Sequence, residues 1–353
     1  MSSQDKLPLV QASLELLVHA LRPHDTIGIV TYSGTSGIVL QPTAVAEKEV
    51  VLAAIQGLRA GGSTNGAAGI VDAYRLAQEH FVEDGVNRVV LASDGDFNVG
   101  VSDRTSLERL IEEKRRTGVF LSVLGFGTGN LKDSQMEALA DKGNGNYSYI
   151  DSRQEARKVL VRNLDATLET IAKDVKLQLE FNPRQIEAFR LIGYENRKLA
   201  HRDFLDPTKD AGEIGAGHSV TALYELVPVG ASLAGTPPLK YQQPGRETEL
   251  TEDALSGEAL TISLNYKRPD SEAVTQLELP VEDVDVPFKE ASQETRFAAA
   301  VASFGMILRG SEYAGGTHLD AVYQWAEGAI GADPDGDRRE FLKLVDWAME
   351  VAR

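Results

Sequence analysis

Two kinds of segment alternate along residues 1–172, and this alternation constrains the fold more than any other feature of the sequence. The runs at 89–91 and 119–124 are apolar at nearly every position, which is typical of strands buried on both faces. A segment with helical periodicity precedes each of these runs, at 67–81 and at 103–118. Strands that alternate with helices predict an α/β fold, with an open, doubly wound, mostly parallel sheet and helices on both of its faces.

The individual elements of this first region can be placed from the same patterns. A pair of strands is expected within 25–42, joined through Ser33 and Gly34. Further strands are expected at 87–93, 119–127 and 146–150, and helices at 7–21, 47–60, 67–81, 103–118, 131–143 and 152–172.

The pattern changes near residue 173. Segments with strand-like alternation then follow one another without helices between them, at 174–181, 189–195, 220–229, 260–267 and 275–281. Helical patterns return at 292–311, 318–330 and 337–353. We therefore expect two domains, 1–173 and 174–353, the second with a β-rich part (174–290) and a helical part (291–353). We also expect the second domain to pack against the first.

Composition excludes several classes of function. The formal net charge is −17, with no long basic block, so a nucleic-acid surface is not expected. There is no cysteine, which excludes disulfides, thiolate chemistry and cysteine-based zinc sites. The longest apolar stretch, 297–308, is about half the ~20 residues that a membrane helix needs and is expected to belong to the core.

Two aspartates follow the apolar run at 89–92, in the stretch VVLASDGDFNVG. Ligands of open α/β sheets bind outside the carboxyl ends of the strands, where Asp94 and Asp96 are expected to lie. The stretch nearly matches the Asp-x-Asp-x-Thr signature of haloacid-dehalogenase phosphatases, in which the first carboxylate attacks phosphorus. Asn98 stands where that signature has threonine. A metal site, a phosphatase nucleophile and a simple turn all remain open.

A second loop with polar oxygens is GGSTNG, residues 61–66. Ser63 or Thr64 could serve only to cap the helix expected from residue 67. A hard divalent cation, however, takes oxygen ligands from separate loops, and Thr64 and Asp94 would supply two of them at one rim of the sheet.

Two other motifs favour turns. GFGTGN (125–130) lacks the last glycine of a dinucleotide-binding fingerprint and is expected to be a turn after a strand. DPDGD (333–337) begins like a calcium loop, but Leu344 stands where a bidentate glutamate belongs. We expect a turn that caps the last helix.

The spacing of GGSTNGAAGI and VVLASDGDFNVG resembles the second and third parts of the metal-ion-dependent adhesion site of von Willebrand factor type A (vWA) domains. The likeness continues through LGFGTGN, LADKGNGNYSYID and TLETIAKDVKLQLEFNP. It extends further, through DAGEIGAGHSVTALYELVPVG, RFAAAVASFGMILRGS and REFLKLV. Over essentially its whole length the chain is similar to the bacterial YfbK-like vWA proteins.

This resemblance implies a non-enzymatic protein-binding or adhesion-type module. Thr64 and Asp94 correspond to metal ligands, and Asp96 to a turn or rim residue without a ligand role. The metal would be Mg²⁺, or Mn²⁺ or Ca²⁺, and an acidic side chain of a partner protein would complete its shell. A bacterial envelope or periplasmic location would also follow.

The sequence departs from the family pattern at its start. In the family an Asp-x-Ser-x-Ser signature ends the first strand and leads into the helix that here begins KLPL. This sequence opens MSSQDKLPLV, so we expect a sheet that lacks the usual first strand and an amino-terminally truncated site that binds Mg²⁺ weakly. A metal-independent structural scaffold and an Mg²⁺-dependent phosphatase using Asp94 are the alternatives.

Overall fold

The fold is described from a computed structural model of the chain. The structure describes residues 3–32, 37–61, 66–95, 104–128 (at 104 and 105 the backbone only), 132–193, 200, 203–206, 211–231 and 250–352. These residues form two compact units: 1–176 with 205–219 and 264–276, and 177–204 with 220–263 and 277–353. The domain boundary expected near residue 173 stays a prediction.

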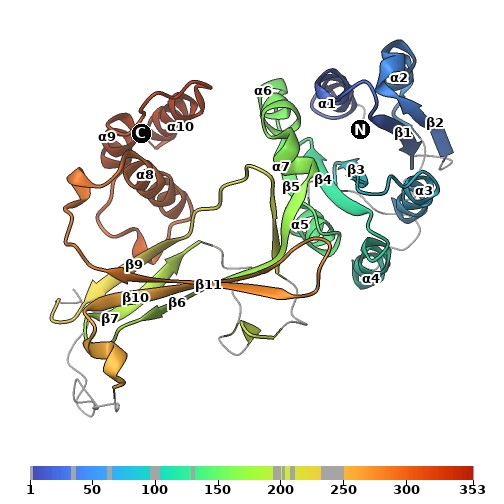
Figure 1. The fold of residues 1–353 in the computed structure, drawn as a ribbon. Helices are drawn as coiled ribbons and strands as arrows, with labels where there is room; N and C mark the ends of the chain where they lie inside the picture. The colour runs from blue at the N-terminus through green and yellow to red at the C-terminus, as the bar shows by residue number, and fades with distance from the viewer. Residues whose placement is uncertain are drawn as a thin grey trace. The chain divides into compact units, whose positions relative to one another are not determined.

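The first part of the chain alternates strands and helices, as the sequence predicts (Figure 1). Its elements are α1 (Leu7–Ala20), β1 (Thr26–Thr31), β2 (Gly37–Ala44), α2 (Lys48–Gly57), α3 (Gly66–Glu79), β3 (Arg88–Ser93), α4 (Arg104–Arg115), β4 (Phe120–Phe126), α5 (Asp133–Lys142), β5 (Tyr147–Ile150), α6 (Arg153–Arg157) and α7 (Leu164–Leu168). A π-helical turn, η2 (Lys158–Arg162), lies between α6 and α7.

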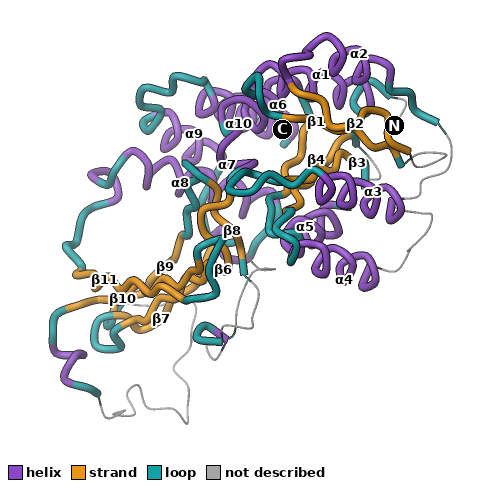
Figure 2. The backbone as a smooth tube through the Cα atoms, turned by 45° about the vertical axis from the view of Figure 1, so that its right-hand side comes forward, coloured by secondary structure: helices purple, strands orange, loops and turns teal. Residues whose placement is uncertain are grey.

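Three of these strands form a parallel sheet in the order β3-β4-β5. Alternate side chains of a strand point to opposite faces, and each face of this sheet has its own apolar core. Val89, Leu91, Leu121 and Val123 pack against α3, α4 and α5. The intervening residues, among them Leu124 and Phe126, pack against α1, α6 and η2. Figure 2 shows these two groups of helices on opposite sides of the strands. The doubly wound architecture is therefore confirmed.

The hairpin β1-β2 forms a second, antiparallel sheet. Among the described residues β1 pairs with β2 alone, and β3 pairs with β4 alone. A side chain joins the two sheets, because the Tyr32 hydroxyl, just after β1, donates to the carbonyl oxygen of Ala92 in β3 at 2.8 Å. Ile27, Ile29 and Leu40 of the hairpin pack against α1 and α2.

The β-rich part contains β6 (Thr170–Phe181), β7 (Ile186–Ile192), β8 (Gly212–Gly215), β9 (Leu223–Pro228), β10 (Glu258–Lys267) and β11 (Val274–Glu282). Four of these strands form a sheet in the order β11-β10-β6-β8, and β7 pairs with β9. The helical part contains α8 (Gln293–Leu308), α9 (Leu319–Glu327) and α10 (Asp337–Val351) (Figure 1). These three helices share one apolar core.

One predicted element is wrong. The sequence predicts a single helix over 152–172, but the helical region is interrupted by the π turn and ends at Leu168. β6 begins at Thr170, because Thr170 and Ala172 pair with β8. The β-branched pair Thr170 and Ile171 favours a strand once such a partner is present.

Candidate functional site

The carboxyl ends of β3 and β4 lie at the same level. The two strands pair in parallel register, with Ser93 beside Gly125, so the residues that follow them meet at one rim of the sheet. Residues 90 and 92 contribute to the core on the α1 side, and strand alternation carries Asp94 to the same side. Asp94 therefore faces the segment that leads into α1.

That segment supplies a cation to Asp94. The Lys6 Nζ lies 2.8 Å from the Asp94 Oδ2, and the two side chains are only 14% and 13% exposed. The aliphatic part of Lys6 passes over Gly127, where a Cβ would lie 2.5 Å from the Lys6 Cε. Gly127 also has a φ of +83°, a conformation that L side chains rarely adopt. A glycine is therefore required at this position for Lys6 to reach Asp94.

Asp5 fixes the same segment to the end of β4. Its Oδ2 accepts hydrogen bonds from the Thr128 N–H at 3.0 Å and from the Thr128 hydroxyl at 3.3 Å. Hydrogen bonds from Ser3 and from the N–H of Thr128 hold the pKa of Asp5 below its ordinary value. Consecutive residues, Asp5 and Lys6, thus contact the ends of two neighbouring strands.

The electrostatics at Asp94 are those of a shielded ion pair. Burial raises the pKa of Asp94, but the hydrogen bond and the charge of Lys6, together with the charge of the amino terminus, leave the pKa below its ordinary value. Nearby, burial raises the pKa of Tyr32 to about 12, and the charge of Asp94 adds to this increase while a hydrogen bond with Ser93 opposes it. Asp94 is therefore ionised at neutral pH, and Tyr32 is neutral.

The second ligand expected from the sequence, Thr64, lies outside the described residues, as does Asp96. Across the ranges that the structure describes, no group of three or more His, Asp or Glu side chains could hold a metal ion. Of the two ligands expected from the sequence, Asp94 lies within the described residues. Its Oδ2 accepts a hydrogen bond from the Lys6 ammonium group. The described residues therefore do not fit the oxygen-rich shell of a divalent cation.

The other motifs can be placed in part. Asp333 caps α10, because its carboxylate accepts hydrogen bonds from the N–H groups of Arg338 and Arg339, both at 3.1 Å. The interpretation of DPDGD as a capping turn is confirmed. Phe297, Ala300 and Phe304 pack in the core of the C-terminal helices, which confirms the core role expected for 297–308. In 125–130, β4 ends at Phe126, one residue before the expected end of the strand, and residues 129 and 130 lie outside the described part of the chain.

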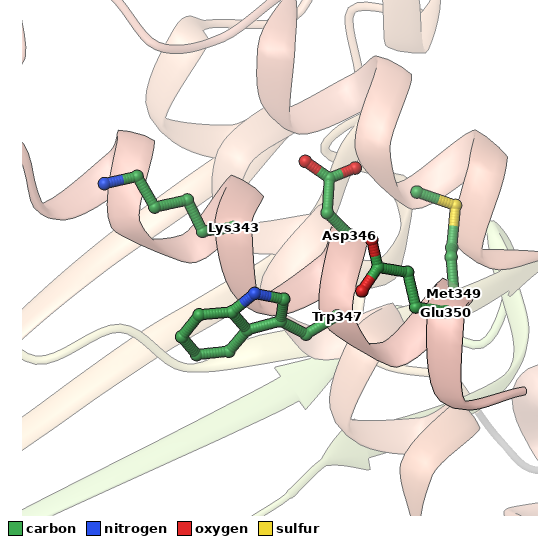
Figure 3. Close-up of a pocket in the computed structure, with 5 residues that line it drawn as sticks. All are labelled: Lys343, Asp346, Trp347, Met349 and Glu350. Atoms are coloured by element: carbon green, nitrogen blue, oxygen red, sulfur yellow. The ribbon is translucent and has the colours of Figure 1, made fainter.

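A surface hollow lies on α10, in the other unit of the chain (Figure 3). It measures about 330 Å³ and is lined by Lys343, Asp346, Trp347, Met349 and Glu350. All five residues come from this one helix.

Sequence reasoning found Asp94 but missed Lys6, Asp5 and Tyr32. The Lys6–Asp94 contact joins residues 88 positions apart. No local motif marks it. The available signal was the strand alternation that turns Asp94 toward the start of α1.

The fold and the strand-end site define a class of protein. Residues 1–163 match the family described as von Willebrand factor type A domain, which is a protein-interaction or adhesion-type module. Residues 166–351 match the family described as "Uncharacterized protein YfbK, C-terminal". The chain belongs to the YfbK-like family of vWA proteins.

A curated relative supports this assignment. The chain is 43% identical over 349 residues to "Uncharacterized protein YfbK" of Escherichia coli (strain K12). The alignment covers 99% of this chain and 59% of that protein, so the chain spans about three fifths of the relative's length.

Solved structures are also similar. A von Willebrand factor type A protein from Catenulispora acidiphila is 13% identical, with 96% of this chain and 77% of that chain covered and a TM-score of 0.48. The ArnB paralog VWA2 from Sulfolobus acidocaldarius is 16% identical, with 98% of this chain and 84% of that chain covered and a TM-score of 0.39.

Within the described ranges, no helix has both the length and the apolar character needed to cross a membrane.

Proposed function

We propose that the chain is a non-enzymatic binding module that holds a protein partner at the carboxyl ends of β3 and β4. The observation that supports this most directly is the position of Asp94, a shielded carboxylate at the strand-end rim where open α/β sheets bind their ligands. The vWA family match supports the same class of function.

Thr64 and Asp94 are the metal ligands of this proposal. Two oxygen ligands would hold Mg²⁺, Mn²⁺ or Ca²⁺ weakly, and an acidic side chain of the partner would add a further oxygen. An envelope location belongs to the proposal as well and rests on the family resemblance. The domain division at residue 173 is kept as a proposal.

Site-specific photo-crosslinking tests the binding surface. Lys132 is exposed, and its backbone nitrogen lies beside Gly95 at the proposed rim. Glu83 is exposed and precedes the amino end of β3, whereas the proposed rim lies at the carboxyl ends of the strands. It serves as the matched control. With a photoreactive residue at either position, the chain is irradiated in an extract of its source organism.

A protein adduct is expected from position 132 and not from position 83, with a several-fold lower yield in the Asp94→Asn background. Equal adducts from both positions, or a yield that Asp94→Asn leaves unchanged, would contradict a binding surface at this rim.

Two alternatives are separated by simple assays. A phosphatase would hydrolyse an aryl phosphate with Mg²⁺, and Asp94→Asn would abolish that turnover. We expect no turnover by the wild type or by Asp94→Asn.

A metal-independent scaffold would give the same crosslinks with and without EDTA. The Lys6–Asp94 ion pair favours the metal-independent scaffold over the phosphatase, since Lys6 neutralises the carboxylate without a metal.

A further inference from the structure

The strand-end site already contains a cation. The Lys6 ammonium bonds the Asp94 carboxylate at 2.8 Å, and both side chains are largely shielded from water. Several contacts hold Lys6 in this position. Asp5 bonds Thr128 at the end of β4, and the Lys6 side chain lies over Gly127. Lys6 is followed at once by α1, whose apolar side packs on the sheet.

We propose that Lys6 is the resident counter-cation of this site, and that it competes with divalent ions for Asp94 and keeps their affinity low. This inference rests on the proposed role of Asp94 as a metal ligand. It adds the residue that decides whether the carboxylate meets an ammonium group or a metal.

The competition has a simple physical cause. Nζ and a metal ion would both bind the Asp94 carboxylate, and two cations a few ångströms apart repel each other, most strongly where water is excluded. A divalent ion could bind Asp94 closely only if the Lys6 side chain left it. Lys6 would then lose its ion pair with Asp94, in which the Lys6 side chain is 14% exposed and the Asp94 side chain 13%.

Binding of Mn²⁺ alone, followed by electron paramagnetic resonance of the free ion, tests the competition. Lys6→Met removes the ammonium group and keeps an aliphatic side chain over Gly127. We expect Lys6→Met to bind Mn²⁺ roughly fivefold more tightly than the wild type, the change expected when one competing ion pair is lost. Lys6→Arg keeps the charge and should stay close to the wild type.

The double variant Lys6→Met/Asp94→Asn should lose the added affinity, which would place the Mn²⁺ at Asp94. Equal Mn²⁺ affinity in the wild type and Lys6→Met, including no binding by either, would overturn the competition. Circular dichroism spectra of all four proteins control for folding.

Amine labelling provides a second readout that does not depend on metal. Lys6 should react with an acetylating reagent several-fold more slowly than Lys132, which is exposed on the same rim. Asp94→Asn should bring the Lys6 rate close to that of Lys132 and leave Lys132 unchanged. Equal rates for the two lysines in the wild type would overturn the role of Lys6 as resident counter-cation.

The two proposals can fail separately. If photo-crosslinking finds no partner while Lys6→Met still tightens Mn²⁺ binding, the binding function fails and the role of Lys6 stands. If a partner crosslinks at position 132 but Mn²⁺ affinity is the same with and without Lys6, the inference about Lys6 fails and the binding function stands.

Discussion

The strands β4 and β11 show two different ways of building a sheet in one chain. β4 is buried at every position but its first, which is half-buried, because helices cover both faces of the parallel sheet. β11 is exposed at most positions, including Leu277 at 53% and Leu279 at 60%. In the parallel sheet polar groups can reach solvent mainly at the strand ends, which is where Asp94 lies. In β11 polar and apolar side chains are spread along the strand.

The largest expected effect comes from shortening one leucine in each strand. Leu121 of β4 is fully buried, so Leu121→Ala should lower the free energy of unfolding by about 2–5 kcal/mol. Leu279→Ala in β11 should change it by no more than about 0.5 kcal/mol. Urea denaturation followed by circular dichroism measures both. A loss from Leu279→Ala as large as that from Leu121→Ala would break the comparison, because it would show that β11 is covered in solution.

A smaller effect is expected from adding a single methyl group. A Cβ on Gly145, beside β4, would lie 2.6 Å from the carbonyl carbon of Leu121, so the backbone would have to move. Gly145→Ala should cost about 1–3 kcal/mol. Gly212 in β8 has nothing within 4 Å of such an atom, and Gly212→Ala should be neutral or slightly stabilising.

Hydrogen exchange should localise the Gly145→Ala effect to β4 and β5. If protection fell equally in β6 and β8, the parallel sheet and the sheet that contains β6 and β8 would open together as one cooperative body.

Much of the N-terminal unit could be predicted from sequence because its signals are local. The apolar runs of β3 and β4 and the periodic helices between them give the layered sheet and place Asp94 at a strand end. The start of β6 could not be predicted, because Thr170 continues a helical pattern and becomes a strand only through pairing with Gly215. β8 itself, GEIG, is too short and glycine-rich to show an alternation.

The candidate site divides in the same way. The carboxylate was predictable from the turn that follows β3. Its partner was not, because the Lys6–Asp94 bond depends on how α1 packs against the sheet, across 88 positions of sequence. A lysine before a helix has no pattern of its own, and at most sites it is simply solvated.

The smallest expected effect is a difference in how two ion pairs contribute to stability as the pH changes. At the end of β3 Asp94 is shielded with Lys6; just before β11 the side chain of Glu272 is 79% exposed beside Lys173 and Lys267. Hydrogen bonds from these two lysines lower the pKa of Glu272, and Lys6 lowers that of Asp94 against the effect of burial. A lowered pKa in the folded state stabilises the protein above the unfolded pKa, which is 3.8 for Asp94 and 4.5 for Glu272.

Each contribution is therefore lost as the pH falls below these values. Between pH 6 and pH 3 the stability difference between the wild type and Asp94→Asn should shrink by about 1 kcal/mol, and that for Glu272→Gln by a few tenths at most, because water screens the exposed pair. Adding 1 M NaCl should remove the Glu272 contribution and leave most of that of Asp94, because shielded pairs are screened least. Thermal unfolding at the two pH values measures all three proteins. An Asp94 contribution as sensitive to salt as that of Glu272 would mean that the Lys6–Asp94 pair is open to water, and the contrast between the two regions would then lie in their packing alone.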